Sequence, residues 1–395
     1  MVKIIKTYTL CLLGVFFLML VSCSIPQECI DFNLNKTAQN FSEKQDADFV
    51  KTPISELGQF NLADAIQYDI AGRMTSVYNI IKAPYNKADS QCKAINKANN
   101  IESYGRYWHG TPMILRFLLV FMTNQGVDIL IKVLFILLTI ALLFSLYKKL
   151  GIKIALIFML SLLSINAWGF VINISNFSVY LLMCIGSLYL LWSKNRSDNI
   201  FIVLGCLTCI FDFLTCEILT LGIPFIIYYL LDENLKFKDL IRIVLYWGIA
   251  YCFTFLLKVF LLFIVVGNVE NVISGIKNRT ESFSLNIFTD MLNAVYFNIR
   301  RTTIMNKLDN LYSVLICFIL FLGAVLVLCR KKLKQHKLLL IISILPFIRY
   351  IVLSNHSYYH AFFTYRDLMI YYIVLFYLVS QTMKKSIWGI SFFKA

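Results

Sequence analysis

The strongest constraint on this chain is a succession of long apolar runs. Of its 395 residues, 59% are hydrophobic and 15% are charged, whereas an average soluble domain is about 25% charged. About 20 consecutive apolar residues are enough to cross a bilayer as a helix. The sequence therefore predicts an all-α, polytopic transmembrane helix bundle with about ten spans. We expect them near 8–25, 127–147, 152–172, 177–193, 199–217, 219–231, 240–267, 311–329, 338–353 and 368–383.

One of these runs, 219–231, is short and is interrupted by Gly222 and Pro224. Half of a broken or re-entrant helix has the same appearance as a short span. Both interpretations of this run stay open at the level of sequence.

The basic residues orient the predicted bundle. Eighteen Lys and Arg fall at the chain ends or in very short segments on one side, whereas the short segments 173–177 and 354–367 on the other side contain only Arg366. Cytoplasmic loops are the ones that are rich in Lys and Arg. Both termini are therefore predicted to be cytoplasmic. The net charge of +15 is explained in this way and requires no nucleic-acid partner.

This orientation divides the chain into five parts. The segment 26–113 contains ten acidic and nine basic residues, which favours a small extracytoplasmic subdomain over a linker. The parts are a first transmembrane helix acting as a signal anchor (1–25), an extracytoplasmic loop with amphipathic helices (26–126), transmembrane helices (127–267), a second extracytoplasmic loop (268–310) and C-terminal transmembrane helices (311–395).

The first helix has two interpretations. Leu20 to Cys23 matches a lipobox behind a basic start and an apolar core, which would make Cys23 a lipidated N-terminus. The alternative, which we favour, is an uncleaved first span, because a chain with nine further spans gains little from an acyl anchor.

Ionisable residues inside the predicted spans are few, and each is a candidate functional residue because a charge in hydrocarbon is costly. They are Lys132, Asp212, Glu217, Lys258 and Arg349. We expect Asp212 or Glu217 to face the bundle interior near Arg349. Either a functional site or a structural ion pair would explain such an arrangement.

Two polar, aromatic clusters lie on the predicted outer side. The first comprises Arg106, Tyr107, Trp108 and His109, and the second runs from His356 through His360 to Tyr365 and Arg366. Arginine and aromatic rings together are suited to a phosphate and a sugar ring. We expect the clusters to meet at one cavity with a carboxylate of the first loop. An aromatic belt facing lipid head groups is the alternative.

Motifs of soluble-type catalysis are absent from the sequence. There is no Walker loop, GxGxxG, GxSxG or HExxH pattern. Among the eleven Cys, Cys206 and Cys209 have CxxC spacing, but they lie inside an apolar run, where Cys acts as a small hydrophobic residue. His356 and His360 have the spacing of metal ligands on a helix, but no third ligand is near them in the sequence. We therefore expect no metal site, and the sequence leaves cofactors open.

The chain resembles the bacterial membrane glycosyltransferases of the C-type (GT-C) superfamily, which use polyprenyl-phosphate-linked sugars. The resemblance covers the whole architecture: a first helix, a large acidic outer loop, and many further helices. The segments 106–110 and 363–366 are also similar to those of uncharacterised bacterial proteins of this type. The resemblance implies that a carboxylate of the first outer loop is the general base. The tight acidic pair of that superfamily is absent here.

The implied function is transfer of a sugar from a polyprenyl-phosphate donor to a cell-surface glycan or lipid acceptor at the outer face. The implied location is a bacterial plasma membrane. A polysaccharide polymerase and a non-enzymatic transporter or flippase are the alternatives. The implied partners are the lipid-linked donor and membrane lipids, with no nucleic acid. The candidate catalytic residues are Asp31, Asp64 and Asp69, and the candidate substrate-binding residues are Arg106, Tyr107, Trp108, His109, Arg116, Asp212, Glu217, Arg349, His356, His360, Tyr365 and Arg366.

The predicted orientation is testable by cysteine labelling of intact cells. A Lys334→Cys variant should resist a membrane-impermeant thiol reagent, because Lys334 belongs to the basic, cytoplasmic set. A cysteine introduced in 26–113 should react. Labelling at position 334 in intact cells would contradict the orientation.

Overall fold

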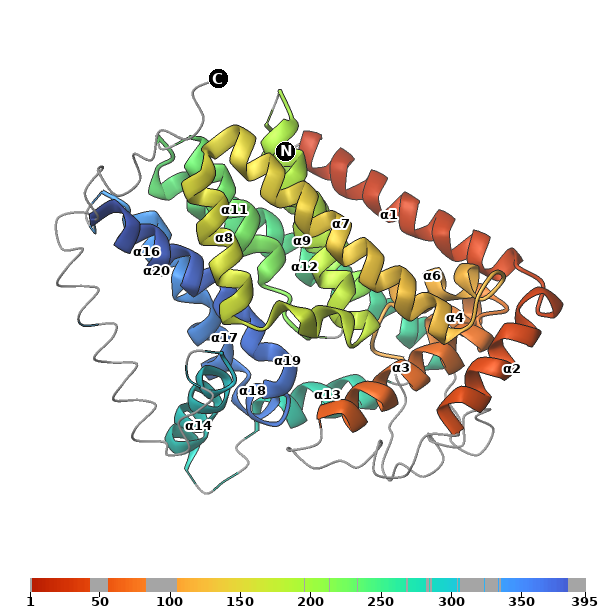
Figure 1. Ribbon diagram of the computed structural model, residues 1–395. Coiled ribbons are helices and arrows are strands. Elements are labelled where there is room, and N and C mark those ends of the chain that lie inside the picture. Colours follow the sequence, from red (N-terminus) through yellow and green to blue (C-terminus); the bar gives the residue numbers. More distant parts are fainter. Residues whose placement is uncertain are drawn as a thin grey trace.

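The computed structural model describes residues 2–42, 56–82 and 105–382, apart from residues 195, 213, 233, 268, 282–283, 285, 304, 306–322, 324–332 and 334. Every regular element in these residues is helical (Figure 1). The prediction of an all-α chain is confirmed for this part of the protein.

In the described residues, five helical stretches are long and apolar enough to cross a membrane. The predicted span 311–329 lies outside the described residues, except for position 323. Three shorter apolar helices run among them: α8 (Ile152–Ser164), α10 (Asn199–Phe211) and α11 (Leu219–Leu231). Although α11 contains Pro224, it forms one helix. The five long stretches are α1 (Val2–Ser24), α7 (Asn124–Leu150), α9 (Ile174–Trp192), α12 (Phe237–Val266) and Ala361–Gln381, most of which is α20 (Leu368–Thr382).

The remaining described helices are not both long and apolar enough to cross a membrane. Among them, α2, α3, α13, α14 and α18 gather at the end of the bundle opposite the N-terminus, which we call the loop end (Figure 1). The bounds of all the remaining helices are α2 (Glu28–Ser42), α3 (Glu56–Arg73), α4 (Val77–Lys82), α6 (Gly110–Leu118), η3 (Ala167–Val171), α13 (Glu270–Thr280), α14 (Ile287–Arg300), α16 (Lys337–Ser343), α17 (Leu345–Val352), α18 (Ser354–Tyr359), α19 (Ala361–Thr364) and η4 (Tyr365–Asp367).

The apolar side chains are distributed as a lipid environment requires. Peripheral helices expose large apolar side chains: Phe17 of α1 is 69% exposed, Ile129 of α7 is 64% exposed and Phe253 of α12 is 59% exposed. Such a surface is unfavourable in water. The helices α9 and α20 are mostly buried instead. Together with helix length, this pattern indicates a membrane protein.

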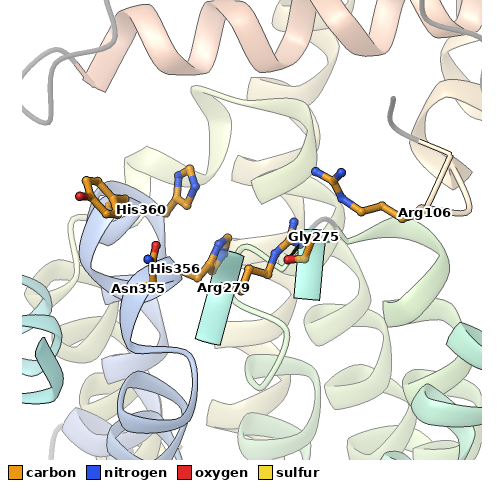
Figure 2. A pocket seen from close by; sticks show the side chains of 7 residues that line it. Arg106, Gly275, Arg279, Asn355, His356 and His360 are labelled. Carbon is orange, nitrogen blue, oxygen red and sulfur yellow. Dashed lines mark hydrogen bonds between the residues drawn. The ribbon is translucent and has the colours of Figure 1, made fainter. Parts of the chain in front are cut away.

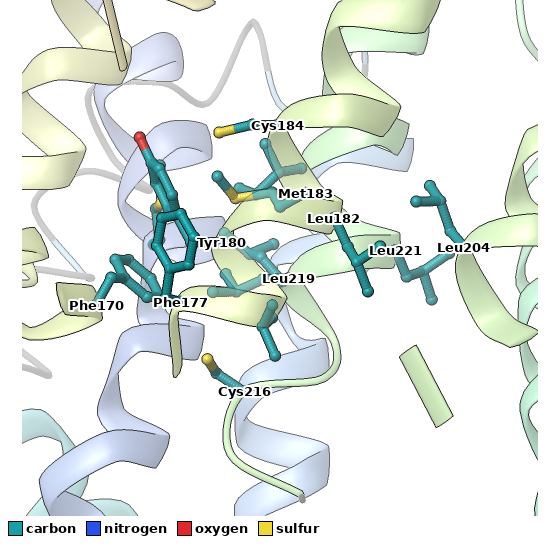
Figure 3. Packing of buried hydrophobic residues seen from close by; sticks show 14 of the residues in the cluster. Phe170, Phe177, Tyr180, Leu182, Met183, Cys184, Leu204, Cys216, Leu219 and Leu221 are labelled. Atoms are coloured by element: carbon teal, nitrogen blue, oxygen red, sulfur yellow. The ribbon is translucent and has the colours of Figure 1, made fainter. Parts of the chain in front are cut away.

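Aromatic rings fill the interior around α9. The Tyr180 ring lies 4.9 Å from that of Phe170 and 4.8 Å from that of Phe135, measured between centroids. Figure 3 shows Phe170, Phe177 and Tyr180 beside Leu219 of α11. These contacts join α7, η3, α9 and α11 into one core.

A glycine permits the close approach of α10 and α12. A Cβ atom at Gly205 of α10 would lie 2.2 Å from the main-chain oxygen of Trp247 on α12. No side chain fits in that space, because backbone cannot move aside as a flexible side chain can. Small residues at helix crossings are typical of membrane bundles, where close backbone packing replaces the hydrophobic effect.

This crossing yields a test with an internal control. A Gly205→Ala variant should be destabilised by about 1–3 kcal/mol, because the helices must separate to admit the methyl group. Gly248→Ala, on α12, adds its Cβ where nothing lies within 4 Å. It should be neutral or slightly stabilising, since alanine is the better helix former. Thermal denaturation in detergent would measure both, and equal behaviour of the two variants would contradict the close crossing.

Candidate functional site

A polar cavity of about 240 Å³ lies at the loop end of the bundle. Three segments far apart in the chain form it: the residues that precede α6, helix α13 and helix α18 (Figure 2). Its lining consists of Arg106, Gly275, Arg279, Asn355, His356, Tyr359 and His360. The structure thus brings residues of both predicted polar clusters to one place.

Two guanidinium groups supply the positive charge of the cavity. The Arg106 and Arg279 Cζ atoms lie 5.1 and 5.8 Å from the centroid of the Tyr107 ring. Arg279 also donates hydrogen bonds to the Tyr107 hydroxyl and, at 2.6 Å, to the Gly275 carbonyl. Burial alone would raise the pKa of Tyr107, but Arg279 and Arg106 outweigh it and lower that pKa. No acidic side chain is among the described residues that line the cavity, so its chemistry suits an anion.

The two histidines are neutral near pH 7. Burial, followed by the charges of neighbouring groups, holds the pKa of His356 well below its usual value, and burial together with Arg279 lowers the pKa of His360 to about 4. Their ring centroids are 4.5 Å apart, and the His360 ring stacks on Phe363. The imidazoles therefore offer hydrogen bonds to a ligand without adding charge.

Directly behind the histidines lies a buried ionic cluster centred on Arg349 of α17. Its Nε donates to Glu217 Oε1 at 2.9 Å, and its Nη2 donates to Glu217 Oε2 at 3.3 Å. The expected proximity of Glu217 and Arg349 in the bundle interior is confirmed. The same guanidinium donates to Ser357 Oγ at 3.1 Å and to the Leu214 carbonyl at 2.9 Å.

The loop between α10 and α11 holds the second predicted acid of this region. Asp212 is buried and accepts hydrogen bonds from the Thr215 amide at 3.0 Å and the Thr215 hydroxyl at 2.5 Å. Burial, with the Glu217 charge, raises the pKa of Asp212 to about 7. Leu214 has a φ of +62°, a left-handed conformation that is strained for a leucine. This loop does not line the cavity, but it lies directly beside it: Leu214 contacts His356 through its carbonyl oxygen, and the charge of Asp212 acts on Tyr107.

Sequence reasoning missed two charged residues of this region. Arg279 belongs to the basic last turn of α13, and an amphipathic helix in the second predicted outer loop was its available signal. Asp367 is fully buried beside Arg366, and its Oδ2 lies 3.3 Å from Arg349 Nε. Neither Asp367 oxygen accepts a hydrogen bond from the described residues. Its position directly before the last predicted span, 368–383, and beside Arg366 was the signal for it.

The predicted catalytic carboxylates of the first loop do not line the cavity. Asp64 accepts from Asn173 Nδ2 at 2.7 Å and from the Ile174 amide at 3.2 Å, so it stabilises the start of α9. Asp69 forms an ion pair with Arg73 at 3.0 Å. Asp31 accepts from Gln27 Nε2 at 2.9 Å. Local contacts within the fold thus engage all three acids.

Arg116, a predicted substrate-binding residue, is buried away from the cavity and joins three segments. Its guanidinium donates hydrogen bonds of 2.8–3.2 Å to the carbonyl oxygens of Ser22, Ile25, Ala71 and Gly72 and to Gln27 Oε1. These bonds engage every N–H group of the side chain. The geometry of Arg116 accounts for a role in holding α1 and α3 together.

Four other predicted residues are buried in the fold beside the cavity: Trp108, His109, Tyr365 and Arg366. Trp108 donates from Nε1 to the Thr254 carbonyl at 2.8 Å. His109 is buried, with a φ of +60°, directly before α6. Arg366 lies over the Tyr365 and Phe170 rings, and a Cβ atom at Gly169 would lie 1.7 Å from its Nη2. None of these four residues lines the cavity.

No set of metal ligands is present in the described part of the chain. Nowhere in it do three or more His, Cys, Asp or Glu side chains come together as a metal ion requires. Comparison with protein-family models, with curated proteins and with solved structures finds no match to the chain.

The Arg349 cluster yields a stability prediction. Arg349→Met should destabilise the protein by about 3–5 kcal/mol, because it leaves the buried Glu217 carboxylate without its partner. Adding Glu217→Gln should recover part of the loss, since the uncompensated charge disappears. Denaturation of the detergent-solubilised protein would measure both effects.

Arg242 is a matched control. It pairs with Asp198 at 2.6 Å, but its side chain is 43% exposed, against 4% for that of Arg349. Arg242→Met should therefore cost at most about 1 kcal/mol. A similar loss in the two single variants would contradict the importance of burial at Arg349.

Proposed function

We propose that this protein is a membrane glycosyltransferase that moves a sugar from a polyprenyl-phosphate donor to a cell-surface glycan or lipid acceptor. The observation that carries the proposal is the cavity in which Arg106 and Arg279 face a space without acidic lining residues. Its volume of about 240 Å³ is that of about eight water molecules, comparable with a phosphate group and one sugar ring.

The proposed topology has ten crossings, with both termini in the bacterial cytoplasm and the loop end outside. The basic residues of the sequence support this orientation. The five long and three short apolar helices support a high number of crossings. In this orientation the segments 26–126 and 268–310 lie outside, and a lipid-linked donor reaches the cavity with its chain in the bilayer and its head group at the membrane surface.

In the proposed reaction, the acceptor hydroxyl oxygen attacks the anomeric carbon of the donor sugar. The bond from that carbon to the phosphate oxygen breaks, and its electron pair leaves with the phosphate, whose charge Arg106 and Arg279 stabilise. The hydroxyl proton passes to Asp212, the proposed general base. Asp212 lies behind the lining of the cavity, close enough for its charge to act on Tyr107. A pKa of about 7 suits this task, because the carboxylate is partly ionised at neutral pH and still basic.

A transporter is the weaker candidate. Transport sites lie near the bilayer midplane, between the two halves of the molecule. The cavity and the Arg349 cluster instead lie at the loop end of the bundle, where α13 and α18 gather. That placement favours a site for head-group chemistry at the membrane surface.

The proposal is tested in membranes that contain the protein and a radiolabelled polyprenyl-phosphate hexose. Asp212→Asn should lower label transfer into cell-envelope glycan by about 10²–10⁴-fold, because the base is lost. Donor binding should persist in that variant. Arg279→Gln should weaken donor binding itself, because one phosphate contact is removed.

Asp198→Asn is the control, since Asp198 belongs to the surface ion pair with Arg242 and should leave transfer unchanged. Wild-type membranes that transfer no label above membranes lacking the protein would refute the transferase. Wild-type levels of transfer by the Asp212→Asn variant would refute only the role of Asp212 as general base, and not the transferase activity.

A further inference from the structure

A main-chain carbonyl determines the tautomer of His356. The Nε2 atom of His356 lies 2.8 Å from the Leu214 oxygen. A carbonyl oxygen only accepts hydrogen bonds, so Nε2 must carry a proton and donate. The ring is neutral near pH 7, since its pKa is lowered by burial and by the neighbouring charges of His360, Arg349 and Arg279. Nδ1 is consequently a lone-pair acceptor.

The carbonyl that imposes this tautomer is itself held in place. The Leu214 oxygen also accepts a hydrogen bond of 2.9 Å from Arg349 Nη2. Arg349 is in turn bound to Glu217 and to Ser357, the neighbour of His356. The buried ionic cluster therefore orients the imidazole, as carbonyl and carboxylate partners orient histidines in other sites.

The acceptor Nδ1 has no hydrogen-bond partner among the described residues, although His356 lines the cavity. The strongest polar groups around the same cavity are donors, because a guanidinium group has no acceptor. A phosphodiester oxygen satisfies Arg106 and Arg279 but has no proton to offer Nδ1. A ligand that pairs with both the guanidinium groups and Nδ1 needs a hydrogen-bond donor beside its anionic group.

We infer that the occupant of the cavity places a hydroxyl group against His356 Nδ1, so that the cavity selects a hydroxyl-bearing anion over a bare phosphate. This inference rests on the proposed function for the identity of that anion, a sugar linked to a lipid phosphate. Under it, His356 is a specificity-determining residue: the arginines bind the phosphate, and the imidazole recognises the sugar.

Two isosteric variants separate the two nitrogens of the ring. Glutamine places its amide nitrogen near the position of Nε2, so His356→Gln keeps a donor to Leu214 and loses the Nδ1 acceptor. Asparagine places its amide oxygen near the position of Nδ1, so His356→Asn keeps an acceptor and loses the donor to Leu214. Thermal denaturation would verify that each variant folds.

The experiment measures binding of two probes to the full-length protein in lipid nanodiscs: polyprenyl-phosphate hexose and polyprenyl phosphate without sugar. His356→Gln should weaken binding of the hexose probe about five- to tenfold, the effect of one neutral hydrogen bond, and leave binding of polyprenyl phosphate unchanged. His356→Asn should bind the hexose probe more tightly than His356→Gln. Arg279→Gln should weaken binding of both probes.

The outcomes distinguish this inference from the function beneath it. If His356→Gln weakens binding of both probes equally, or of neither, the hydroxyl contact is refuted. Transfer activity in wild-type membranes would still support the proposed transferase. If the wild-type protein binds polyprenyl phosphate as tightly as the hexose probe, the selection is refuted. If it binds neither probe, the inference falls together with the proposed function.

Discussion

The arrangement of the loop end depends on the buried guanidinium of Arg349. A charge at such a position is tolerated only when every partner is in place. Its partners come from separate segments: Glu217 and Leu214 before α11, Ser357 on α18 and Asp367 in η4. Satisfying one side chain therefore sets the position of three segments against α17. One wall of the cavity follows from that arrangement.

Lipid-facing and polar surfaces are separated by position along the helices. Side chains such as Phe17 and Phe253 cover the flanks of the bundle, where water would disfavour them and lipid does not. Polar side chains collect at the loop end, where α13 and α18 close over the start of α6. Tight contacts between helices use glycine, as at Gly205 against Trp247 and at Gly169 against Arg366. The apolar flanks suit the bundle to a lipid environment, and the loop end holds the polar residues of the candidate site.

The candidate site could be predicted in part. The sequence indicated Arg106, His356 and His360 because they stand among aromatic residues on the predicted outer side, and the structure brings these residues to one cavity. The sequence could not distinguish Arg116, which has a structural role, from the arginine and histidines that line the cavity. A ligand-binding arginine and a structural arginine have the same composition around them, and the acceptors of Arg116 lie 44 to 94 positions away in the chain. The carboxylate at Asp64 was ambiguous for the same reason.

The sequence by itself determined that the chain is helical and apolar enough for a membrane, because a bilayer imposes long apolar runs and internal backbone hydrogen bonding. It also determined that the few ionisable residues inside those runs need polar partners. Only the tertiary structure decided the partners: Glu217 for Arg349, Thr215 for Asp212, and Arg279 of α13 beside Arg106. Hydropathy along the chain specifies which segments are apolar enough for a membrane, whereas partners depend on which helices pack together, and Glu217 and Arg349 are 132 positions apart.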